Sequence, residues 1–318
     1  MKTNLLPIVG ATAVLAGCMF ASSASAVVWD VFPKDVRTVG IVSVSDIIGA
    51  ASLMRATNEL SKAGYAVKVM PNVSGPKQVS AAERARYFEE AWLDPSVDLL
   101  MFSTGGKGAI DVIDVINWEK LKARDMRVIG YSDLTLVLNT MVRKGVGHPL
   151  TGPMISTLGS LKTSDEARLR MRATLDGTPK ETQLRAVRKA SGVIVGKPMG
   201  GLLDRVWKLA ERGLLPSAEG RIVFLENTPK YGGKARRMLD RLIELSVFDK
   251  AVAVVFCDFN RNDPAEDVAR VFSDFANKVE CPVYCGYPYG HVANNYLLDF
   301  KMQMAITLDD RIVKAPDK

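Results

Sequence analysis

The stretch RVIGYSDLT at residues 127–135 decides the fold, because an apolar run passes directly into a helical pattern there. Residues 127–131 are predicted to form a buried strand, and residues 133–143 a helix. Short apolar runs alternate in the same way with helical patterns along the rest of the chain. Such alternation predicts a parallel sheet that is covered by helices on both faces.

The same pattern extends from this stretch towards both ends of the chain. The box Ser80-Ala81-Ala82-Glu83 opens a helix, and Gly64 is positioned to end the helix before it. Strands are predicted at 39–45, 66–70, 98–103, 193–195, 221–226, 251–257, 282–286 and 302–308. Further helices are predicted at 48–62, 203–212, 234–245 and 265–278. Another helix is predicted to follow the glycine-rich turn at 105–108 and to end at about residue 117.

The chain length and a change in composition indicate two domains. A chain of 318 residues corresponds to about two domains at about 150 residues each. Residues 161–189 are more charged and show no clear strand, although Thr163-Ser164-Asp165-Glu166 can cap a helix. We therefore predict an α/β domain with a parallel sheet at 27–160, a linker at 161–190, and an α/β domain with a mixed sheet at 191–318.

The N-terminus has the features of an export signal. Lys2 precedes an apolar segment, residues 5–15, that is too short to span a membrane. Cleavage after Ala24-Ser25-Ala26 gives a mature chain from Val27, whereas Leu15-Ala16-Gly17-Cys18 resembles a lipobox in which Cys18 is lipidated. Both routes remain open, and both predict a periplasmic or cell-envelope protein, anchored to the membrane if Cys18 carries the lipid.

The composition argues against several classes of protein. Only two histidines and four cysteines occur, without the spacing of a structural zinc site, so no metal and no cofactor is expected. The formal charge is +7, or +6 without Lys2, but no basic run with interleaved aromatic residues indicates nucleic acid. Export permits one disulfide among Cys257, Cys281 and Cys285, and buried free thiols are an equal alternative.

Ser132 is the first candidate for chemistry. It lies where the strand meets the helix in Gly130-Tyr131-Ser132-Asp133, which lifts its hydroxyl above the edge of the sheet. A nucleophile elbow uses this arrangement, although Leu134 stands where that motif has its second glycine. The alternative is that Ser132 only caps the helix.

Glu226 and His291 are the residues that can complete a catalytic triad with Ser132. Glu226 ends the predicted strand at 221–226, and the carboxyl ends of strands are where the sites of α/β proteins gather. His291 lies in a turn that follows the strand at 282–286, where an imidazole can act as a general base. His148 is the competing base, but Gly147 and Pro149 on either side favour a structural loop.

Several motifs together make the chain resemble the LD-carboxypeptidases, or muramoyltetrapeptide carboxypeptidases, whose relatives include the microcin C self-immunity peptidases. The resemblance covers residues 38–309. Each motif is weak alone, but their order and spacing are specific. The motifs are Gly105-Gly106-x-Gly108, Gly130-Tyr131-Ser132-Asp133-x-Thr135, Gly152-Pro153-Met154, Gly200-Gly201, Phe224-Leu225-Glu226 and Gly290-His291.

The resemblance implies a serine peptidase whose active site lies in the cleft between two α/β domains. It implies Ser132 as the nucleophile, His291 as the general base and Glu226 as the acid that orients the histidine. It further implies an oxyanion hole formed by the backbone N–H of Asp133 and of a glycine in the Gly105-Gly106 turn. Members of this family are commonly homodimers.

Four residues depart from the family pattern near the substrate. Thr104 stands for the usual Arg, and Lys107 for the usual Tyr, on either side of the paired glycines. Thr151 replaces a His, and Leu202 replaces an Asn. Without the Arg, the chain lacks a planar clamp for a substrate carboxylate, for which Lys107 is the candidate replacement.

Three hypotheses follow for the function. The first is an exported serine carboxypeptidase that cleaves an L,D-peptide bond and releases the terminal D-alanine of peptidoglycan tetrapeptide stems. The second is a periplasmic protein that binds a cell-wall peptide without catalysis. The third is a hydrolase of a toxin-like peptide or acyl-adenylate.

Overall fold

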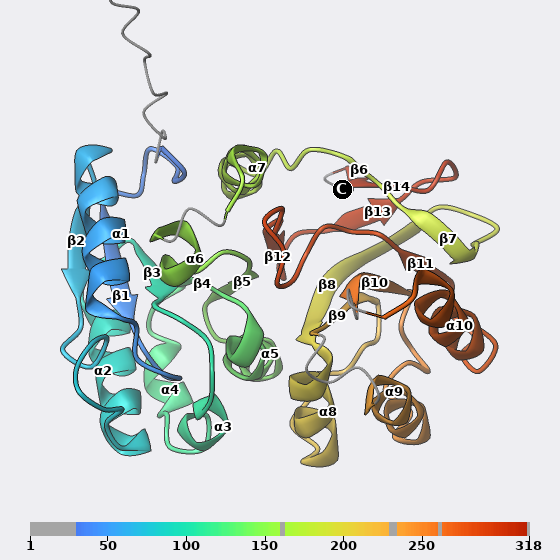
Figure 1. The fold of residues 1–318 in the computed structure, drawn as a ribbon, viewed down its shortest axis with the longest axis horizontal. Coiled ribbons are helices and arrows are strands. Elements are labelled where there is room, and N and C mark those ends of the chain that lie inside the picture. The colour runs from blue at the N-terminus through green and yellow to red at the C-terminus, as the bar shows by residue number, and fades with distance from the viewer. Residues whose placement is uncertain (1–29, 160–162, 229–233, 260–262, 317–318) are drawn as a thin grey trace, which may run out of the picture.

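The computed structural model describes residues 30–159, 163–228, 234–259 and 263–316. The predicted export signal, with Cys18, lies outside these residues. Two α/β domains lie side by side, each built on its own sheet (Figure 1). The predicted fold class is therefore confirmed: helices pack on strands in both domains, and the second sheet is mixed.

The first sheet has six strands, of which all but β12 run parallel. Their order in space is β12 (Leu298–Asp299), β5 (His148–Thr151), β4 (Arg127–Gly130), β3 (Leu99–Phe102), β1 (Thr38–Val42) and β2 (Ala66–Val69). The helices of this domain are α1 (Ala50–Lys62), α2 (Ala81–Leu93), α3 (Ala109–Val112), α4 (Trp118–Leu121), α5 (Thr135–Lys144) and α6 (Ile155–Gly159).

Both faces of the first sheet are covered, because neighbouring residues in a strand point to opposite sides. Val39 and Ile41 pack with residues of α1 and α6 in one buried cluster. Val42 belongs to a second cluster on the other face, with residues of α2 to α5. This double coverage explains why β3 is buried at every position and is apolar throughout.

The second sheet has eight strands in the order β6 (Thr182–Gln183), β14 (Arg311–Lys314), β13 (Met304–Ile306), β8 (Ile194–Leu202), β9 (Arg221–Asn227), β10 (Ala253–Phe259), β11 (Val283–Cys285) and β7 (Arg185–Arg188). Only the central strands, from β8 to β11, run parallel to one another. One face carries α8 (Leu203–Glu211), α9 (Ala235–Glu244) and α10 (Ala265–Ala276). α7 (Asp165–Leu175) lies along the connection between the domains (Figure 1).

The two domains are joined by more than a linker. Strand β12 comes late in the chain but pairs antiparallel with β5 of the first sheet, so that Leu298 lies opposite Thr151. One buried cluster also contains Val137 of the first domain together with Phe224 and Tyr289 of the second. A shared core of this kind holds the domains in a defined relative position.

Residues 161–189 differ from the sequence-based prediction, because they contain two strands as well as α7. Ser164 caps α7 as expected, with its hydroxyl accepting a hydrogen bond from the N–H of Ala167. β6 and β7 are the outermost strands of the second sheet, and their side chains are charged, polar or largely exposed. Strands at a sheet edge need little apolar surface, so they leave no clear pattern in the sequence.

Two smaller predictions are also corrected. His148 begins strand β5 and does not lie in a loop, because its backbone pairs with β4. The helix predicted up to residue 117 is shorter than expected, because α3 ends at Val112, and a separate short helix, α4, begins after Asn117, which caps it. The predicted helix at 133–143 begins as a short 3-10 turn, η1 (Ser132–Leu134), and continues as α5.

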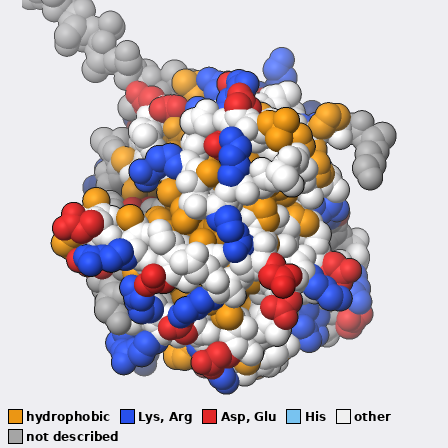
Figure 2. All heavy atoms as spheres, turned by 90° about the vertical axis from the view of Figure 1, so that its right-hand side faces the viewer, with side chains coloured by type: hydrophobic (Ala, Val, Ile, Leu, Met, Phe, Trp, Pro, Cys, Tyr) orange, Lys and Arg blue, Asp and Glu red, His pale blue; other side chains and the backbone are white. Residues whose placement is uncertain are grey.

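The three cysteines in the described part of the chain are buried free thiols. Among the described residues, none of the helices has the length and apolar character that crossing a membrane requires. Figure 2 shows that basic and acidic side chains alternate over the outer face of the second domain. Exposed pairs such as Arg236 with Asp274 and Lys278 with Asp240 contribute little to stability, because water screens them.

Candidate active site

Ser132 occupies a strained turn between β4 and α5. Its backbone φ is +63°, a left-handed conformation that residues other than glycine rarely adopt and that costs roughly 1–3 kcal/mol. The turn follows the last residue of β4, Gly130, and precedes the first turn of α5. A hydroxyl on such a turn is exposed at the carboxyl end of the parallel strands.

Gly105 lies directly beside this hydroxyl. A β-carbon built on Gly105 would be 3.0 Å from the Oγ of Ser132 and 3.6 Å from the backbone nitrogen of Asp133. A larger residue would therefore crowd the serine, and the absent side chain lets the backbone of the 105–106 turn approach it. The two predicted segments, Gly105-Gly106 and Ser132-Asp133, thus face each other across the same small space.

Glu226 and His291 come from the second domain and meet Ser132 in one hydrogen-bonded series. The Nε2 atom of His291 lies 3.1 Å from the Oγ of Ser132. Its other ring nitrogen, Nδ1, lies 3.0 Å from Oε2 of Glu226. Glu226 is fully buried near the end of β9, whereas the side chain of His291 is 29% exposed. The three residues thus have the spacing and order of a serine-histidine-acid triad.

The loop of His291 is held against Glu226 by close backbone packing. A β-carbon on Gly290 would lie 3.0 Å from the β-carbon of Glu226, and the φ of Gly290 is +126°, so glycine is required there. The N–H of Gly290 donates a hydrogen bond to Oδ1 of Asn295, at 3.1 Å. These contacts place the imidazole between the buried acid and the hydroxyl.

Buried hydrogen bonds between the domains keep Glu226 at the correct distance from Ser132. Asn139 of α5 donates to the carbonyl of Gly200 at 2.8 Å and accepts from its N–H at 3.1 Å. The hydroxyl of Thr135 accepts from the N–H of Leu202 at 3.1 Å. Because Leu202 lies opposite Glu226 in the pairing of β8 with β9, α5 is tied to the strand next to the acid.

Comparison with known proteins identifies the family. Residues 39–150 match the LD-carboxypeptidase N-terminal domain, and residues 187–306 match the LD-carboxypeptidase C-terminal domain. The chain belongs to the LD-carboxypeptidase family. The family is one of serine carboxypeptidases, so the general reaction is hydrolysis of a peptide at its carboxyl end.

Individual relatives agree with this assignment. The murein tetrapeptide carboxypeptidase of Pseudomonas aeruginosa is 26% identical over 227 residues, which cover 67% of this chain and 73% of that protein. Two solved structures share the fold. The muramoyltetrapeptide carboxypeptidase of Oxalobacter formigenes has a TM-score of 0.74 at 21% identity and covers 88% of this chain and 100% of that one. An MccF-like protein of Streptococcus pneumoniae in complex with AMP has a TM-score of 0.78 at 16% identity, covering 89% and 100%.

The LD-carboxypeptidase site is deeply buried on the side of the second domain. Tyr289 is fully buried, and its hydroxyl lies 2.7 Å from the Oγ1 of Thr151. Burial raises the pKa of Tyr289 well above its usual value, and the nearby negative charge of Glu226 raises it further. The pKa of the Cys257 thiol is raised by the same two causes, in the same order. Both groups therefore stay protonated beside the acid at neutral pH.

The other residues that the sequence singled out have varied surroundings. Lys107 is exposed, and Thr104 is half-buried immediately before Gly105. Thr151 and Leu202 are buried, and both take part in the contacts between the domains described above. The competing base His148 does not face Ser132, because its Nε2 lies 2.7 Å from Oδ1 of Asp299 on β12.

The residues that support the nucleophile turn were not predicted from the sequence. The carboxylate of Asp133 accepts hydrogen bonds from the hydroxyl of Ser45, at 2.7 Å, and from the Nε of Arg205, at 2.6 Å. Ser45 follows β1 and Arg205 belongs to α8, so both are far from Asp133 in the sequence. No motif surrounds either residue, and only the folded arrangement brings them to the site.

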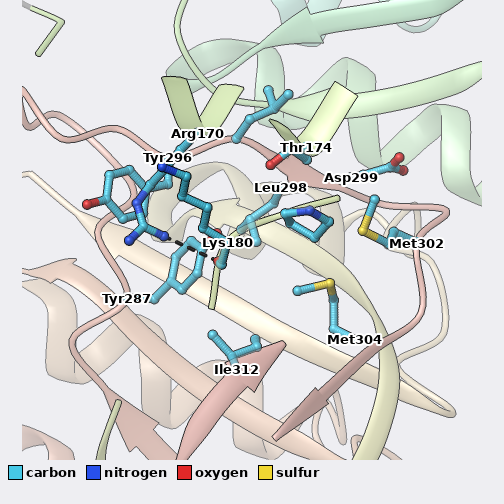
Figure 3. A pocket seen from close by; sticks show the side chains of 12 residues that line it. Arg170, Thr174, Lys180, Tyr287, Tyr296, Leu298, Asp299, Met302, Met304 and Ile312 are labelled. Carbon is cyan, nitrogen blue, oxygen red and sulfur yellow. Dashed lines mark hydrogen bonds between the residues drawn. The ribbon is translucent and has the colours of Figure 1, made fainter. Parts of the chain in front are cut away.

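Away from the triad, the described residues offer no metal centre, and the crevice beside α7 is very small. The residues that the structure describes contain no group of three or more histidines, cysteines or acids that could hold a metal ion. A crevice between α7 and the strands β12 to β14 includes Arg170, Tyr287 and Tyr296 (Figure 3). It encloses only about 10 Å³, which is room for one water molecule, and none of the three triad residues lines it.

Proposed function

We propose that this LD-carboxypeptidase is an exported enzyme that cleaves an L,D-peptide bond and releases the terminal D-alanine of peptidoglycan tetrapeptide stems. The observation that carries the proposal is the hydrogen-bonded series from Ser132 through His291 to Glu226. The similarity to the murein tetrapeptide carboxypeptidase supports the choice of substrate.

In the proposed mechanism, the Oγ of Ser132 attacks the carbonyl carbon of the scissile bond while Nε2 of His291 takes the hydroxyl proton. Glu226 stabilises the imidazolium that forms, because its buried carboxylate lies beside Nδ1. His291 then gives the proton to the leaving amine, the C–N bond breaks, and an acyl-enzyme ester remains. Water, activated by the same imidazole, hydrolyses the ester and restores the serine.

Backbone N–H groups are proposed to stabilise the oxyanion of this mechanism. The N–H of Asp133 is one donor, since it starts a helical turn where the first N–H groups lack partners within the helix. The Gly105-Gly106 turn supplies the other, and the closeness of Gly105 to Ser132 supports that choice. Lys107 and Thr104, which flank this turn, are proposed to contact the substrate.

The variant Ser132→Ala tests the proposal. It is expected to release D-alanine from purified muropeptides at less than about one thousandth of the normal rate, since the nucleophile is lost. Chromatographic detection of D-alanine is the measurement. The matched control is Ser246→Ala, because Ser246 is also a serine with a left-handed backbone, with φ +56°, but lies beyond the end of α9. Equal D-alanine release by Ser132→Ala and wild-type protein would remove Ser132 from the nucleophile role.

A fluorophosphonate probe separates this proposal from a protein that only binds the peptide. The probe forms a covalent bond with an activated serine and loses fluoride, so labelling reports the nucleophile without any peptide substrate. We expect labelling that disappears in Ser132→Ala and persists in Ser246→Ala. Tight muropeptide binding without labelling would instead support the binding protein.

A second candidate substrate is an acyl-adenylate or toxin-like peptide. The fold match to the MccF-like protein solved with AMP favours it, although that match concerns the fold alone. Incubating the enzyme with a tetrapeptide muropeptide and with an aminoacyl sulfamoyl nucleotide distinguishes the two. D-alanine release with no cleavage of the nucleotide conjugate is the expected result, and the reverse would replace the proposed substrate.

Export is proposed from the sequence features of residues 1–26. Mass spectrometry of the protein recovered from bacterial cell envelopes is expected to give a chain that starts at Val27 or at a lipidated Cys18. A full-length chain with Met1 in the cytoplasmic fraction would contradict this part of the proposal. The result leaves the test of Ser132 unaffected, because the two measurements are independent.

A further inference from the structure

The carboxylate of Asp133 connects the nucleophile turn to three other segments of the chain. Its Oδ2 atom accepts hydrogen bonds from the hydroxyl of Ser45, at 2.7 Å, and from the N–H of Ala109, at 3.0 Å. Its Oδ1 atom accepts from Nε of Arg205, at 2.6 Å. Asp133 is only 2% exposed and follows Ser132 directly in the chain. Any shift of this carboxylate therefore moves the backbone that carries the nucleophile.

Arg205 reaches both sides of the proposed oxyanion hole from the second domain. While its Nε holds Asp133, one terminal nitrogen donates to the carbonyl of Gly106 at 3.1 Å. The other terminal nitrogen is bonded to the carboxylate of Asp204, the preceding residue of α8. A guanidinium is planar and rigid, so these three bonds fix the Ser132 turn and the Gly105-Gly106 turn relative to one another.

The charges around Arg205 balance in a place where an unpaired charge would be costly. Arg205 and Asp204 are each 6% exposed, and Lys208 completes the group at 3.2 Å from Asp204. The carboxylates of Asp133 and Asp204 lie beside the cations of Arg205 and Lys208, and the buried guanidinium of Arg84 also interacts with Asp133. These cations compensate for the removal of the two carboxylates from water. Because the buried charges of this network all have hydrogen-bond partners, the network favours a single arrangement of the two turns.

We infer that Arg205 is a positioning residue of the reaction, which aligns the nucleophile turn with the oxyanion donors across the domain boundary. Its hydrogen bonds to Asp133, Asp204 and the carbonyl of Gly106 hold the two turns that flank the reacting hydroxyl, so its role is one of positioning. This inference rests on the proposed function for the identity of the reaction, but the geometry it describes is independent of the substrate.

The test compares Arg205→Ala, Arg205→Lys and wild-type full chains. We expect Arg205→Ala to lower kcat for D-alanine release by about 10- to 100-fold with KM changed less than twofold, because the nucleophile and the oxyanion donors lose their alignment in the transition state. The melting temperature is also expected to fall, because Asp133 and Asp204 lose a buried partner. Arg205→Lys is expected to recover little, since a single ammonium cannot make the three bonds at once. Guanidinium at millimolar concentration is expected to restore part of the kcat of Arg205→Ala, because it fits the space left behind.

The matched control is Arg168→Ala. Arg168 is also a helical arginine that is 6% exposed and paired with an aspartate, Asp165, but it lies on α7 and does not contact the Ser132 turn. We expect its kcat to stay within twofold of wild type even if its melting temperature falls. An equal loss of kcat in Arg168→Ala, a rise in KM alone for Arg205→Ala, or no change in either constant would overturn the inference.

Labelling by the fluorophosphonate probe separates this inference from the proposed function. The labelling rate of Ser132 is expected to fall in Arg205→Ala and to rise again with guanidinium, even if the protein acts on a substrate other than muropeptides. If the wild-type protein is labelled but releases no D-alanine, the proposed substrate is wrong, whereas the inference about Arg205 still holds. Unchanged labelling in Arg205→Ala would overturn the inference and keep the proposed function.

Discussion

The two histidines of the chain each pair with a buried or nearly buried carboxylate, yet they face very different surroundings. His291 binds Glu226 through Nδ1, so its Nε2 points to the hydroxyl of Ser132. His148 binds Asp299 through Nε2, and this pair joins the neighbouring strands β5 and β12. A histidine-acid pair is therefore not itself a sign of catalysis. What matters is which ring nitrogen the acid occupies and what the other nitrogen meets.

Replacing each histidine by glutamine gives the largest expected contrast. His291→Gln is expected to lower kcat by up to about 10,000-fold, because the general base is lost. The same change at His148 is expected to leave kcat within twofold. Steady-state release of D-alanine measures the kcat of both variants. Comparable losses of kcat would show that the different surroundings of the two histidines do not give them different roles.

A smaller but still large effect is expected for Glu226→Gln. The amide keeps the size of the side chain but removes the charge that stabilises the imidazolium, so kcat is expected to fall on the order of 100-fold. Asp299→Asn is the corresponding change in the other pair and is expected to retain normal kcat. Normal activity in Glu226→Gln would mean that the acid only supports the fold.

The pair of His148 with Asp299 is expected to matter for stability, although not for catalysis. His148→Gln is expected to reduce the free energy of unfolding by about 1–2 kcal/mol, since one charge-assisted hydrogen bond between β5 and β12 is lost. Asp299 keeps a second partner, the N–H of Lys301, at 2.8 Å, which limits the loss. Urea denaturation followed by tryptophan fluorescence measures the change. A variant as stable as wild type would show that this pair contributes nothing.

At neutral pH the smallest effect is expected from the buried tyrosine beside Glu226, because its contribution to stability changes only at high pH. The pKa of Tyr289 is raised in the folded state, so the folded protein keeps this proton when the unfolded chain loses it. The free energy of unfolding should therefore fall as pH rises above about 10, by about 1.4 kcal/mol per pH unit for this group. Tyr289→Phe removes the titrating group and is expected to flatten the slope by that amount. An unchanged slope would contradict the assignment.

Local patterns in the sequence were sufficient to predict the alternation of strands and helices, and they marked Ser132, Glu226 and His291 as candidates beside structural alternatives. The resemblance to the LD-carboxypeptidases is what combined the three into one triad. Ser132 and Glu226 lie at the ends of apolar strands and His291 lies in the turn after one, and the carboxyl ends of parallel strands converge. The structure places the three within hydrogen-bonding distance, which a linear pattern cannot do. The roles assigned to them stay proposals until the variants are measured.

The features that sequence patterns did not predict depend on contacts between distant segments. β12 has only two residues and takes its place by pairing with β5. β6 and β7 are edge strands in which charged and polar residues outnumber apolar ones, and β5 begins with a histidine and a proline. Arg205 lies on an amphipathic helix, where a charged residue is normally expected to face water. Only the packing of one domain on the other makes it a buried residue.

The position of β12 has a consequence for how the protein is made on the ribosome. The first five strands of the N-terminal sheet are synthesised well before Leu298 and Asp299, so β5 must wait with an open edge until almost the entire chain has emerged. An unpaired edge can recruit a strand from another molecule. The edge of β5 therefore stays open until β12 pairs with it, and a chain truncated after residue 160 would expose that edge permanently.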